Sequence, residues 1–276
     1  MTSSERIIDL LAKYPANAKA IRKFQAKSDG GRRPIAEPDN ELNKWLKLMN
    51  KALRKHFNSW PSFMHGGIKK RNYVSYAKMH VNKPCVITID IRQCFDSITV
   101  TEVSSALERH LKLPTKVCQE LAGRLCFQGK VGQGFATSNY LSNLYLLDPL
   151  SSLDSSLRKQ GLFFSNYVDD IAISGSINSK DAVINQVATV LSRAKLALNK
   201  SKITVMPSSN QQIVCGLVVN KRISLTKTLK LKIMSDVAND RISSSSLDGW
   251  LANLRVADPK FGEKLGKYAR KKGLIK

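Results

Sequence analysis

The sequence predicts an α+β fold that ends in a basic helical segment. Short β-branched runs alternate with stretches in which apolar residues recur at helical spacing, up to about residue 225. After Asn220 the pattern is helical, and this segment carries 14 Lys and Arg residues against 5 Asp and Glu. We therefore expect a mixed helix-and-sheet body followed by a positively charged helical appendage.

The whole chain is strongly basic. Its 276 residues include 45 Lys and Arg but 21 Asp and Glu, a formal net charge of +24. This surplus favours a polyanionic partner, and charge alone leaves nucleic acid and an acidic membrane surface both open. No run of about 18 apolar residues is present, which excludes a transmembrane helix. The five cysteines form no CxxC pair and the N-terminus has no signal-peptide pattern, so we expect reduced thiols and a cytoplasmic location.

The N-terminal third is predicted to begin with helix. Apolar residues at helical spacing cover residues 5–24, with an interruption near Pro15. Residues 27–39 are rich in Gly, Pro and charge, which predicts an extended hairpin. Residues 41–58 return to an amphipathic helix, and the β-branched run 84–90 predicts a strand that ends in a carboxylate.

The segment after this strand is predicted to alternate between helices and strands. Thr99 and Glu102 stand at capping-box spacing and should begin a helix that runs to about residue 112. Further helices are expected at 115–128, 138–159 and 179–198, and strands within 163–175, 202–206, 212–220 and 223–225. In the basic tail, the four serines 243–246 predict a break between helices.

Two acidic positions are the main evidence for a chemical function. Asp90 ends an apolar strand, and Asp169 and Asp170 occupy the bend of an apolar hairpin. Buried carboxylates are unfavourable unless they are paired or bound to a metal ion, and two adjacent anions also repel each other. A divalent cation relieves both problems, and oxygen-only ligands favour Mg²⁺ or Mn²⁺ over zinc. From these residues alone, the alternative is a solvated β-turn, in which Asp is common.

Six motifs taken together resemble the reverse transcriptases. In chain order they are KSDGGRRPIAEP (27–38), Asp90 with Phe95, QGFATSNYLSN (133–143), YVDD (167–170), LNKSK (198–202) and VCGLVVN (214–220). The resemblance covers about residues 27–225 and implies a right-hand polymerase fold, with fingers, a palm built on an antiparallel sheet flanked by helices, and a small helical thumb. By this resemblance, residues 1–83 would form the fingers and N-terminal helices, 84–220 the catalytic palm with inserted fingers helices, and 221–276 a basic RNA-binding thumb.

The resemblance also implies a site for nucleotidyl transfer with two Mg²⁺ ions, or Mn²⁺, about 3.5–4 Å apart. Asp90 and Asp169 would bridge both ions, with Asp170 in support and the backbone carbonyl of Ile91 as a further ligand. Phe95 would lie under the sugar of the incoming dNTP and exclude a 2′-OH, although plain core packing is the alternative. The other expected nucleotide-binding residues are Lys27, Arg33, Gln133, Gly134 and Lys202.

Each of these nucleotide-binding residues has its own expected contact. Lys27 and Arg33 would clamp triphosphate oxygens, or else form a solvated charged hairpin. Gln133 and Gly134 would begin the helix under the templating pair, where Gly permits close approach of the backbone. Lys202 would face phosphate, or act as the acid that protonates pyrophosphate.

Within the reverse transcriptases, three features resemble the bacterial retron enzymes. The chain ends about 50 residues past the palm hairpin, YAKMH (76–80) is similar to their NAxxH element, and VCG (214–216) is similar to their VTG triplet. Tyr76 and Cys215 depart from those patterns. RNA contacts are then expected from a histidine, the triplet and the basic tail: His80, Val214, Cys215, Gly216, Lys230, Arg255, Lys267, Arg270 and Lys271. For His80 a packed histidine is the alternative.

By this resemblance the chain would bind a structured noncoding RNA and copy part of it into DNA from dNTPs. Synthesis would be primed from an RNA 2′-OH and would give a branched RNA–DNA called msDNA, within an antiphage defence system that has a separate effector protein and no membrane partner. Two alternatives stay open. One is another bacterial reverse transcriptase, of the diversity-generating or abortive-infection type, and the other is a non-catalytic RNA-binding protein on a palm scaffold.

Overall fold

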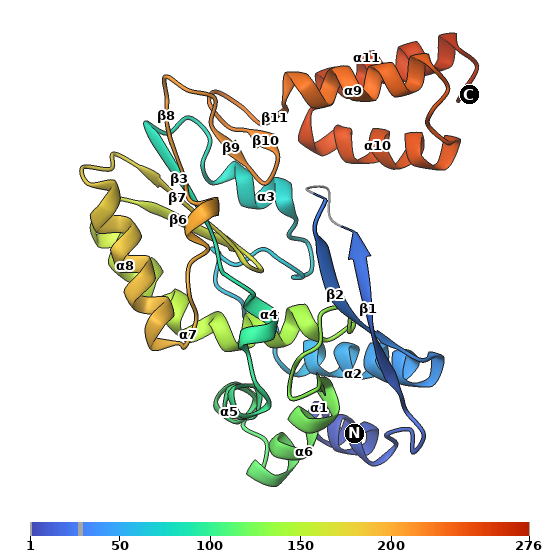
Figure 1. Cartoon of the computed structure of the whole chain (residues 1–276), viewed down its shortest axis with the longest axis vertical. Coiled ribbons are helices and arrows are strands. Elements are labelled where there is room, and N and C mark those ends of the chain that lie inside the picture. The colour runs from blue at the N-terminus through green and yellow to red at the C-terminus, as the bar shows by residue number, and fades with distance from the viewer. Residues whose placement is uncertain (1, 27–29, 276) are drawn as a thin grey trace.

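The largest sheet of the described residues is antiparallel and has four strands, which Figure 1 shows between helices α8 (Lys180–Arg193) and α3 (Tyr73–Lys78). The computed structural model describes residues 2–26 and 30–275. The sheet has the order β6-β7-β3-β8, formed by Phe163–Tyr167, Asp170–Gly175, Cys85–Asp90 and Thr204–Pro207. Its register places Asp90 opposite Asp170 and Ile89 opposite Ile171. The strand at 84–90 and the hairpin within 163–175 are therefore confirmed, and they are direct neighbours.

Different elements cover the two faces of this sheet, because side chains alternate along each strand. Ile87, Ile89 and Ile171 belong to the main core, together with α7 (Ser138–Lys159) and α8 (Lys180–Arg193). Val86 and Ala172 belong to a second core, which includes α3 (Tyr73–Lys78) and the C-terminal helices. Figure 1 shows α8 and α3 on opposite sides of the strands. The predicted helix at 179–198 is shorter than expected, since α8 ends at Arg193.

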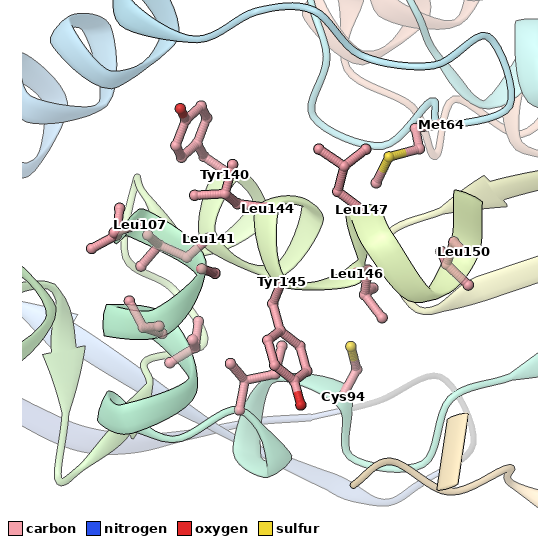
Figure 2. Close-up of a cluster of buried hydrophobic side chains, with 14 of the residues drawn as sticks. Met64, Cys94, Leu107, Tyr140, Leu141, Leu144, Tyr145, Leu146, Leu147 and Leu150 are labelled. Carbon is pink, nitrogen blue, oxygen red and sulfur yellow. The ribbon is translucent and has the colours of Figure 1, made fainter. Parts of the chain in front are cut away.

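Helix α7 is the central support of the main core, and its predicted bounds are confirmed. Buried side chains project from opposite sides of this helix, and Figure 2 shows Tyr140 and Tyr145 pointing away from each other. The Tyr140 hydroxyl donates to the Leu53 carbonyl at 3.1 Å, and the Tyr145 hydroxyl donates to the Ala194 carbonyl at 2.6 Å. A helix that is apolar on nearly all sides is stable only when other elements surround it. The helix thus joins the N-terminal region to the palm-like sheet.

The N-terminal region is only partly as predicted. It contains α1 (Ser3–Ala12), β1 (Ala20–Ala26), β2 (Arg32–Pro38) and α2 (Asn40–His56). The prediction of helix through residue 24 is wrong beyond α1. Ile21 and Phe24 lie three apart as on a helix, but they belong to a strand whose backbone pairs with β2, from Ala20–Pro38 to Ala26–Arg32. Both side chains are exposed, so backbone pairing outweighs the local apolar spacing here.

Short helices and a small hairpin follow the central strand β3. They are α4 (Cys94–Ser97), α5 (Val100–Leu111), α6 (Thr115–Leu125), β4 (Cys126–Phe127) and β5 (Lys130–Val131). The predicted capping box is confirmed, because the Thr99 side chain accepts from the Glu102 N–H while the Glu102 carboxylate accepts from the Thr99 N–H. The helix expected over 115–128 ends earlier, where residues 126 and 127 pair with β5 instead.

The C-terminal region begins with a 3₁₀ turn and a three-stranded sheet and ends in three helices. These elements are η1 (Lys200–Lys202), β9 (Ile213–Val214), β10 (Leu217–Val218), β11 (Ser224–Leu225), α9 (Lys227–Ala238), α10 (Ser244–Ala257) and α11 (Pro259–Lys271). The break between helices, predicted at 243–246, lies slightly earlier, between the end of α9 at Ala238 and the start of α10 at Ser244, which Ser243 caps. None of the described helices is long and apolar enough to cross a membrane.

A buried carboxylate fastens these three helices to the small sheet. Asp258 accepts hydrogen bonds from the Leu225 N–H of β11 and from the Phe261 N–H of α11. It also forms an ion pair with Lys230 of α9, at 2.6 Å. Since α9, α10 and α11 also share the second core with α3 and the central sheet, the basic tail is packed onto the body of the protein.

Candidate active site

Three aspartates meet where β3 and the β6–β7 hairpin reach the same end of the sheet. Asp90 is the last residue of β3 and lies opposite Asp170, the first residue of β7. The Ile91 N–H donates to the Asp169 carbonyl at 2.8 Å, which ties the turn to the end of β3. The sheet register therefore brings together the three carboxylates that the sequence singled out, although Asp90 is far from the other two along the chain.

The turn that carries the paired aspartates is strained. Val168 has φ 60°, in the left-handed region that a β-branched residue rarely adopts. Asn166, fully buried, supports this conformation by donating through Nδ2 to the carbonyls of Val168 at 2.9 Å and Asp170 at 3.3 Å. Gly66 packs against the same turn, and a Cβ there would stand 2.6 Å from the Val168 nitrogen. Strain of this kind persists where the surrounding structure enforces it, and it concentrates at functional sites.

The electrostatics of the cluster favour a cation. Burial raises the pKa of Asp169, and the Asp90 charge raises it further. Burial and the charges of Asp169 and Asp90 raise the pKa of Asp170 to about 6. Asp90 has two partners: Lys202 Nζ forms an ion pair with it at 2.9 Å, and Asn199 Nδ2 donates to it at 3.0 Å. The Lys202 ammonium group and, at Asp169, the Arg33 guanidinium thus face three carboxylates that repel one another.

The donor set fits a divalent metal ion. Within residues 2–26 and 30–275 no three His, Cys, Asp or Glu side chains are already arranged as a metal-binding group. The carboxylate oxygens at this end of the sheet are nevertheless the hard ligands that Mg²⁺ and Mn²⁺ prefer. Burial first, and then the like charges of the cluster, keep the pKa values of Asp169 and Asp170 raised, although Lys202 and, at Asp169, Arg33 act in the opposite direction. Added positive charge at this place would relieve the repulsion.

A cavity of about 350 Å³ opens beside the carboxylates and gathers most of the predicted nucleotide-binding residues. Of these, Arg33, Phe95, Gln133 and Lys202 line it, together with the predicted metal ligands Asp90, Ile91 and Asp169. Arg32, Arg92 and Asn199 line it as well. Phe95 both lines the cavity and packs against the main core, so its two interpretations are compatible. Lys27 lies outside the described residues.

Gly134 contributes through backbone contact rather than by lining this cavity. Its φ is 115°, and a Cβ would stand 2.7 Å from the Ala36 carbonyl oxygen of β2. The neighbouring Gln133 carbonyl accepts the Ala36 N–H at 2.6 Å. Because only glycine allows this approach, the loop before α7 can hold the base of the β1–β2 hairpin beside the cavity.

The expectation that His80 contacts RNA is wrong in this structure. Its side chain is completely buried, with Nδ1 2.7 Å from the Ser174 hydroxyl and Nε2 2.6 Å from the Ser165 hydroxyl. Burial, together with His65 and Lys83, lowers the pKa of His80 to about 3, so the ring is neutral. The packed-histidine alternative is the one that the geometry supports, because no surface of the ring remains for RNA.

The predicted VCG triplet forms the β9–β10 turn. The Val214 side chain is completely buried, which contradicts its assignment as an RNA contact. Cys215 is exposed with φ 48°, and Gly216 follows with φ 77°. Partial burial of its thiol and the charges of Asp170 and Asp169 raise the pKa of Cys215 to about 11. The tip of this turn therefore lies near the carboxylate cluster.

The basic residues expected to bind RNA differ in their exposure and in whether they form ion pairs within the protein. Lys230 is half-buried in its ion pair with Asp258, and Lys267 pairs with Glu263 at 2.7 Å. Arg255, Arg270 and Lys271 are exposed, and no ion pair involves them in the described part of the chain.

Asn199 and Arg92 line this site although the sequence reasoning missed both, and Asn199 is the one that contacts a carboxylate directly. It holds Asp90 twice, because its backbone N–H also donates to the Asp90 carbonyl at 2.8 Å. The available signal was its place in LNKSK, three residues before Lys202. The LNKSK segment returns to the end of β3, so a polar amide at its start is a candidate hydrogen-bond partner for Asp90, the last residue of that strand.

Comparisons with known proteins agree with this arrangement. The family model for reverse transcriptase (RNA-dependent DNA polymerase) matches residues 23–226. The retron Se72 reverse transcriptase of Salmonella heidelberg is 32% identical over 203 residues, which are 71% of this chain and 53% of the relative. The retron Ec48 reverse transcriptase of Escherichia coli is 28% identical over 223 residues, 76% of this chain and 55% of the relative. The chain thus spans about half the length of these curated relatives.

A solved structure agrees at the level of the fold. The telomerase from Candida albicans, in complex with a fragment of telomeric RNA, superposes with a TM-score of 0.53 at 13% identity, over 96% of this chain and 59% of that one. This likeness, with the mixed helices and antiparallel sheet described above, confirms the right-hand polymerase fold. From its motifs, its fold and these matches, the chain belongs to the reverse transcriptase family and is similar within it to the bacterial retron reverse transcriptases.

Proposed function

We propose that this chain is an RNA-directed DNA polymerase of the retron type. The observation that carries the proposal is the meeting of Asp90, Asp169 and Asp170 beside a cavity of about 350 Å³ that Arg33 and Lys202 also border. Acids that repel one another, set against cationic side chains, suit the binding of metal ions together with a triphosphate. Family membership and the retron relatives support the same conclusion.

In this proposal the three aspartates hold a pair of divalent cations, Mg²⁺ or Mn²⁺, with the Ile91 carbonyl as a further ligand. The chemistry that such bound ions supply is activation of the attacking hydroxyl and stabilisation of the leaving pyrophosphate. Asn199 orients the Asp90 carboxylate for this purpose through its hydrogen bond at 3.0 Å. The ordinary divalent-metal dependence of the reverse transcriptase family supports this assignment.

The side chains around the cavity would then position the dNTP. Arg33, on β2, reaches the cavity from the hairpin and suits bidentate contact with phosphate oxygens. Phe95 presents its ring at the cavity wall, where it would exclude a 2′-OH. Lys202 holds a proton on Nζ firmly, because its hydrogen bond to Asp90 raises its pKa. That charge would face phosphate, and the proton is available to the departing pyrophosphate.

We extend the proposal to the domains and partners. Residues 1–83 would act as fingers and N-terminal helices, 84–220 as palm and 221–276 as an RNA-binding thumb. The template and primer would be a structured noncoding RNA, copied from a 2′-OH into msDNA in the cytoplasm, within an antiphage system that uses a separate effector. The retron relatives, the telomerase bound to RNA and the net charge of +24 support an RNA partner.

Sequencing of the nucleic acid that copurifies with the protein tests the retron type. We expect a short, defined DNA joined to RNA through a 2′ branch, and loss of the DNA alone after Asp90→Asn. DNA of varied sequence and length would favour a diversity-generating or abortive-infection enzyme. RNA without DNA, together with no extension of a primer–template by dNTPs and Mg²⁺, would favour the non-catalytic RNA-binding alternative.

A further inference from the structure

Helix α2 carries a lysine stripe that the site described above does not use. The stripe consists of Lys44, Lys47, Lys51 and Lys55, all exposed. Their spacing of three, four and four residues places them on one face of the helix, over about 16 Å of its length. The opposite face, which includes Trp45 and Met49, is buried in the main core.

The charge of this stripe is not neutralised within the protein. In the described part of the chain, none of the four lysines makes an ion pair within 4 Å. Other surface lysines do have such partners, as Lys13 has in Asp9 and Lys195 has in Glu102. Glu41 is the one acidic residue of α2, at its N-terminal end.

A shallow hollow lies beside the stripe. A cavity of about 280 Å³ is lined by Leu48, Lys51, Lys55 and, from α1, Arg6. Leu48 is half-exposed between the lysines. The Arg6 guanidinium is itself paired with Asp9, at 3.1 Å, so the four unpaired ammonium groups on one helix face supply the local field that attracts a polyanion.

Nucleic acid fits this face better than a lipid surface does. An interfacial helix inserts a broad apolar face into a bilayer, but the apolar face of α2 is already buried in the core. A nucleic acid duplex presents on the order of ten phosphate charges over the length of the stripe. The stripe is therefore complementary to a phosphate backbone, and the exposed Leu48 alone is too small for membrane insertion.

We propose that the lysine stripe of α2 is a second RNA-binding surface, which holds the phosphate backbone of an RNA stem. Figure 1 shows α2 beside α1 in the lower part of the view, and the three C-terminal helices at the top. The stem on α2 is then a different part of the RNA from any part that the C-terminal helices hold. In naming RNA as the partner, the inference rests on the proposed function.

The test compares two variants that remove the same charge. In the stripe variant, Lys44, Lys47, Lys51 and Lys55 are changed to Gln. In the matched control, the exposed lysines Lys112, Lys116, Lys159 and Lys180, which also make no ion pair in the described part of the chain, are changed to Gln. Binding of a fluorescein-labelled RNA with two hairpins is measured by fluorescence anisotropy over a range of salt concentrations.

We expect the slope of log affinity against log salt to become shallower by about 3 in the stripe variant and by less than about 1 in the control. Changing the same four lysines to Arg should keep the wild-type slope, because the charge remains. Equal slopes in the stripe and control variants would overturn the proposal. Loss of binding to phosphatidylserine vesicles with no change in the RNA slope would also overturn it.

Primer extension separates this inference from the proposed function. A short preformed primer–template does not reach a second surface, so the stripe variant should extend it at the wild-type rate. If the wild-type protein extends nothing, the polymerase proposal fails, but the difference in salt slope still decides the role of the stripe. Thermal melting of all variants should agree with the wild type, since the four positions are exposed.

Discussion

Strands β6 and β7, with the turn between them, carry two polar groups of opposite character, the first partly buried and the second completely buried. At their turn, Asp169 and Asp170 face Asp90, and burial together with the like charges raises the pKa of both turn residues. Farther along the strands, Ser165 and Ser174 both bond to His80, whose ring is neutral and completely buried. The first group is charged and poorly compensated, whereas the second is uncharged and has a partner for each ring nitrogen.

The difference teaches how a functional polar cluster can be told from a structural one on the same two strands. Buried polar groups that satisfy one another stabilise a fold and need nothing further. Buried carboxylates that repel one another are tolerated where a ligand or metal ion supplies the missing charge. Substitution should therefore affect activity at the carboxylates and stability at the histidine.

The largest expected effect is on synthesis by Asp169→Asn. Removing this carboxylate should lower single-turnover primer extension by about 10³-fold or more, because it is assigned to hold both metal ions. The free energy of unfolding without metal should stay the same or rise, since repulsion with Asp90 and Asp170 is relieved. Urea unfolding measures the second quantity.

An exposed acid on α8 provides the control for this result. Asp181→Asn removes the same charge away from the cavity, so it should leave synthesis unchanged and lower the free energy of unfolding by at most about 1 kcal/mol, because Asp181 lies in the first turn of α8. If Asp169→Asn extended the primer as fast as Asp181→Asn does, the carboxylate cluster would not be the active site. The distinction between the charged cluster and the His80 group would then fail as well.

The next effect is on stability, through His80→Ala. The change leaves two buried hydroxyls without their partner and a cavity where the ring stood, which should lower the free energy of unfolding by about 2–4 kcal/mol. Primer extension at low temperature, per folded molecule, should stay within a few-fold of the wild type. A large loss of activity without a loss of stability would show that the histidine group is not purely structural.

The same histidine predicts a pH dependence of stability. The pKa of His80 is about 3 in the folded chain, against about 6.5 when unfolded, so between these values the unfolded state binds more protons. Stability should therefore rise with pH over this window, by up to about 1.4 kcal/mol per pH unit for this group. Urea midpoints measured across the window should show a shallower rise in His80→Gln.

Other groups also titrate in this window and must be separated from His80, among them Asp169, whose pKa is raised by burial and by the Asp90 charge. His65, with a pKa of about 4, contributes with the same sign and remains in the variant. Asp170, with a pKa raised to about 6, contributes with the opposite sign, so both proteins should be measured in an Asp170→Asn background. An unchanged slope in His80→Gln would mean that the ring is not held neutral in the folded state.

The comparison also explains how far the sequence could predict this molecule. The carboxylates were predictable because strand periodicity and the YVDD motif mark them locally. His80 was misjudged because its partners lie 85 and 94 residues away, a distance that no local pattern reveals. β1 was mistaken for helix for a related reason: Ile21 and Phe24 have helical spacing, but backbone pairing with β2 decides their structure.

The smallest effect is expected from a change at Asn199, which donates hydrogen bonds to both the side chain and the backbone carbonyl of Asp90. Asn199→Ala removes the amide that donates to Asp90 at 3.0 Å but keeps the backbone N–H that donates to the Asp90 carbonyl. Groups that orient a metal ligand typically contribute about 10-fold or more to metal affinity. We therefore expect about 10-fold more Mg²⁺ at half-maximal primer extension, with nearly the same rate at saturating Mg²⁺.

A readout independent of activity completes this last test. Addition of Mn²⁺ should raise the melting temperature of the wild type, and the rise should be smaller at a given concentration in Asn199→Ala. Ser201→Ala removes only the hydroxyl that donates to the side-chain Oδ1 of Asn199 at 2.9 Å, so its effect should be weaker and in the same direction. If Asn199→Ala lowered extension equally at every Mg²⁺ concentration, the amide would not act through metal binding, and the carboxylate cluster would have no positioning partner comparable to the serines that hold His80.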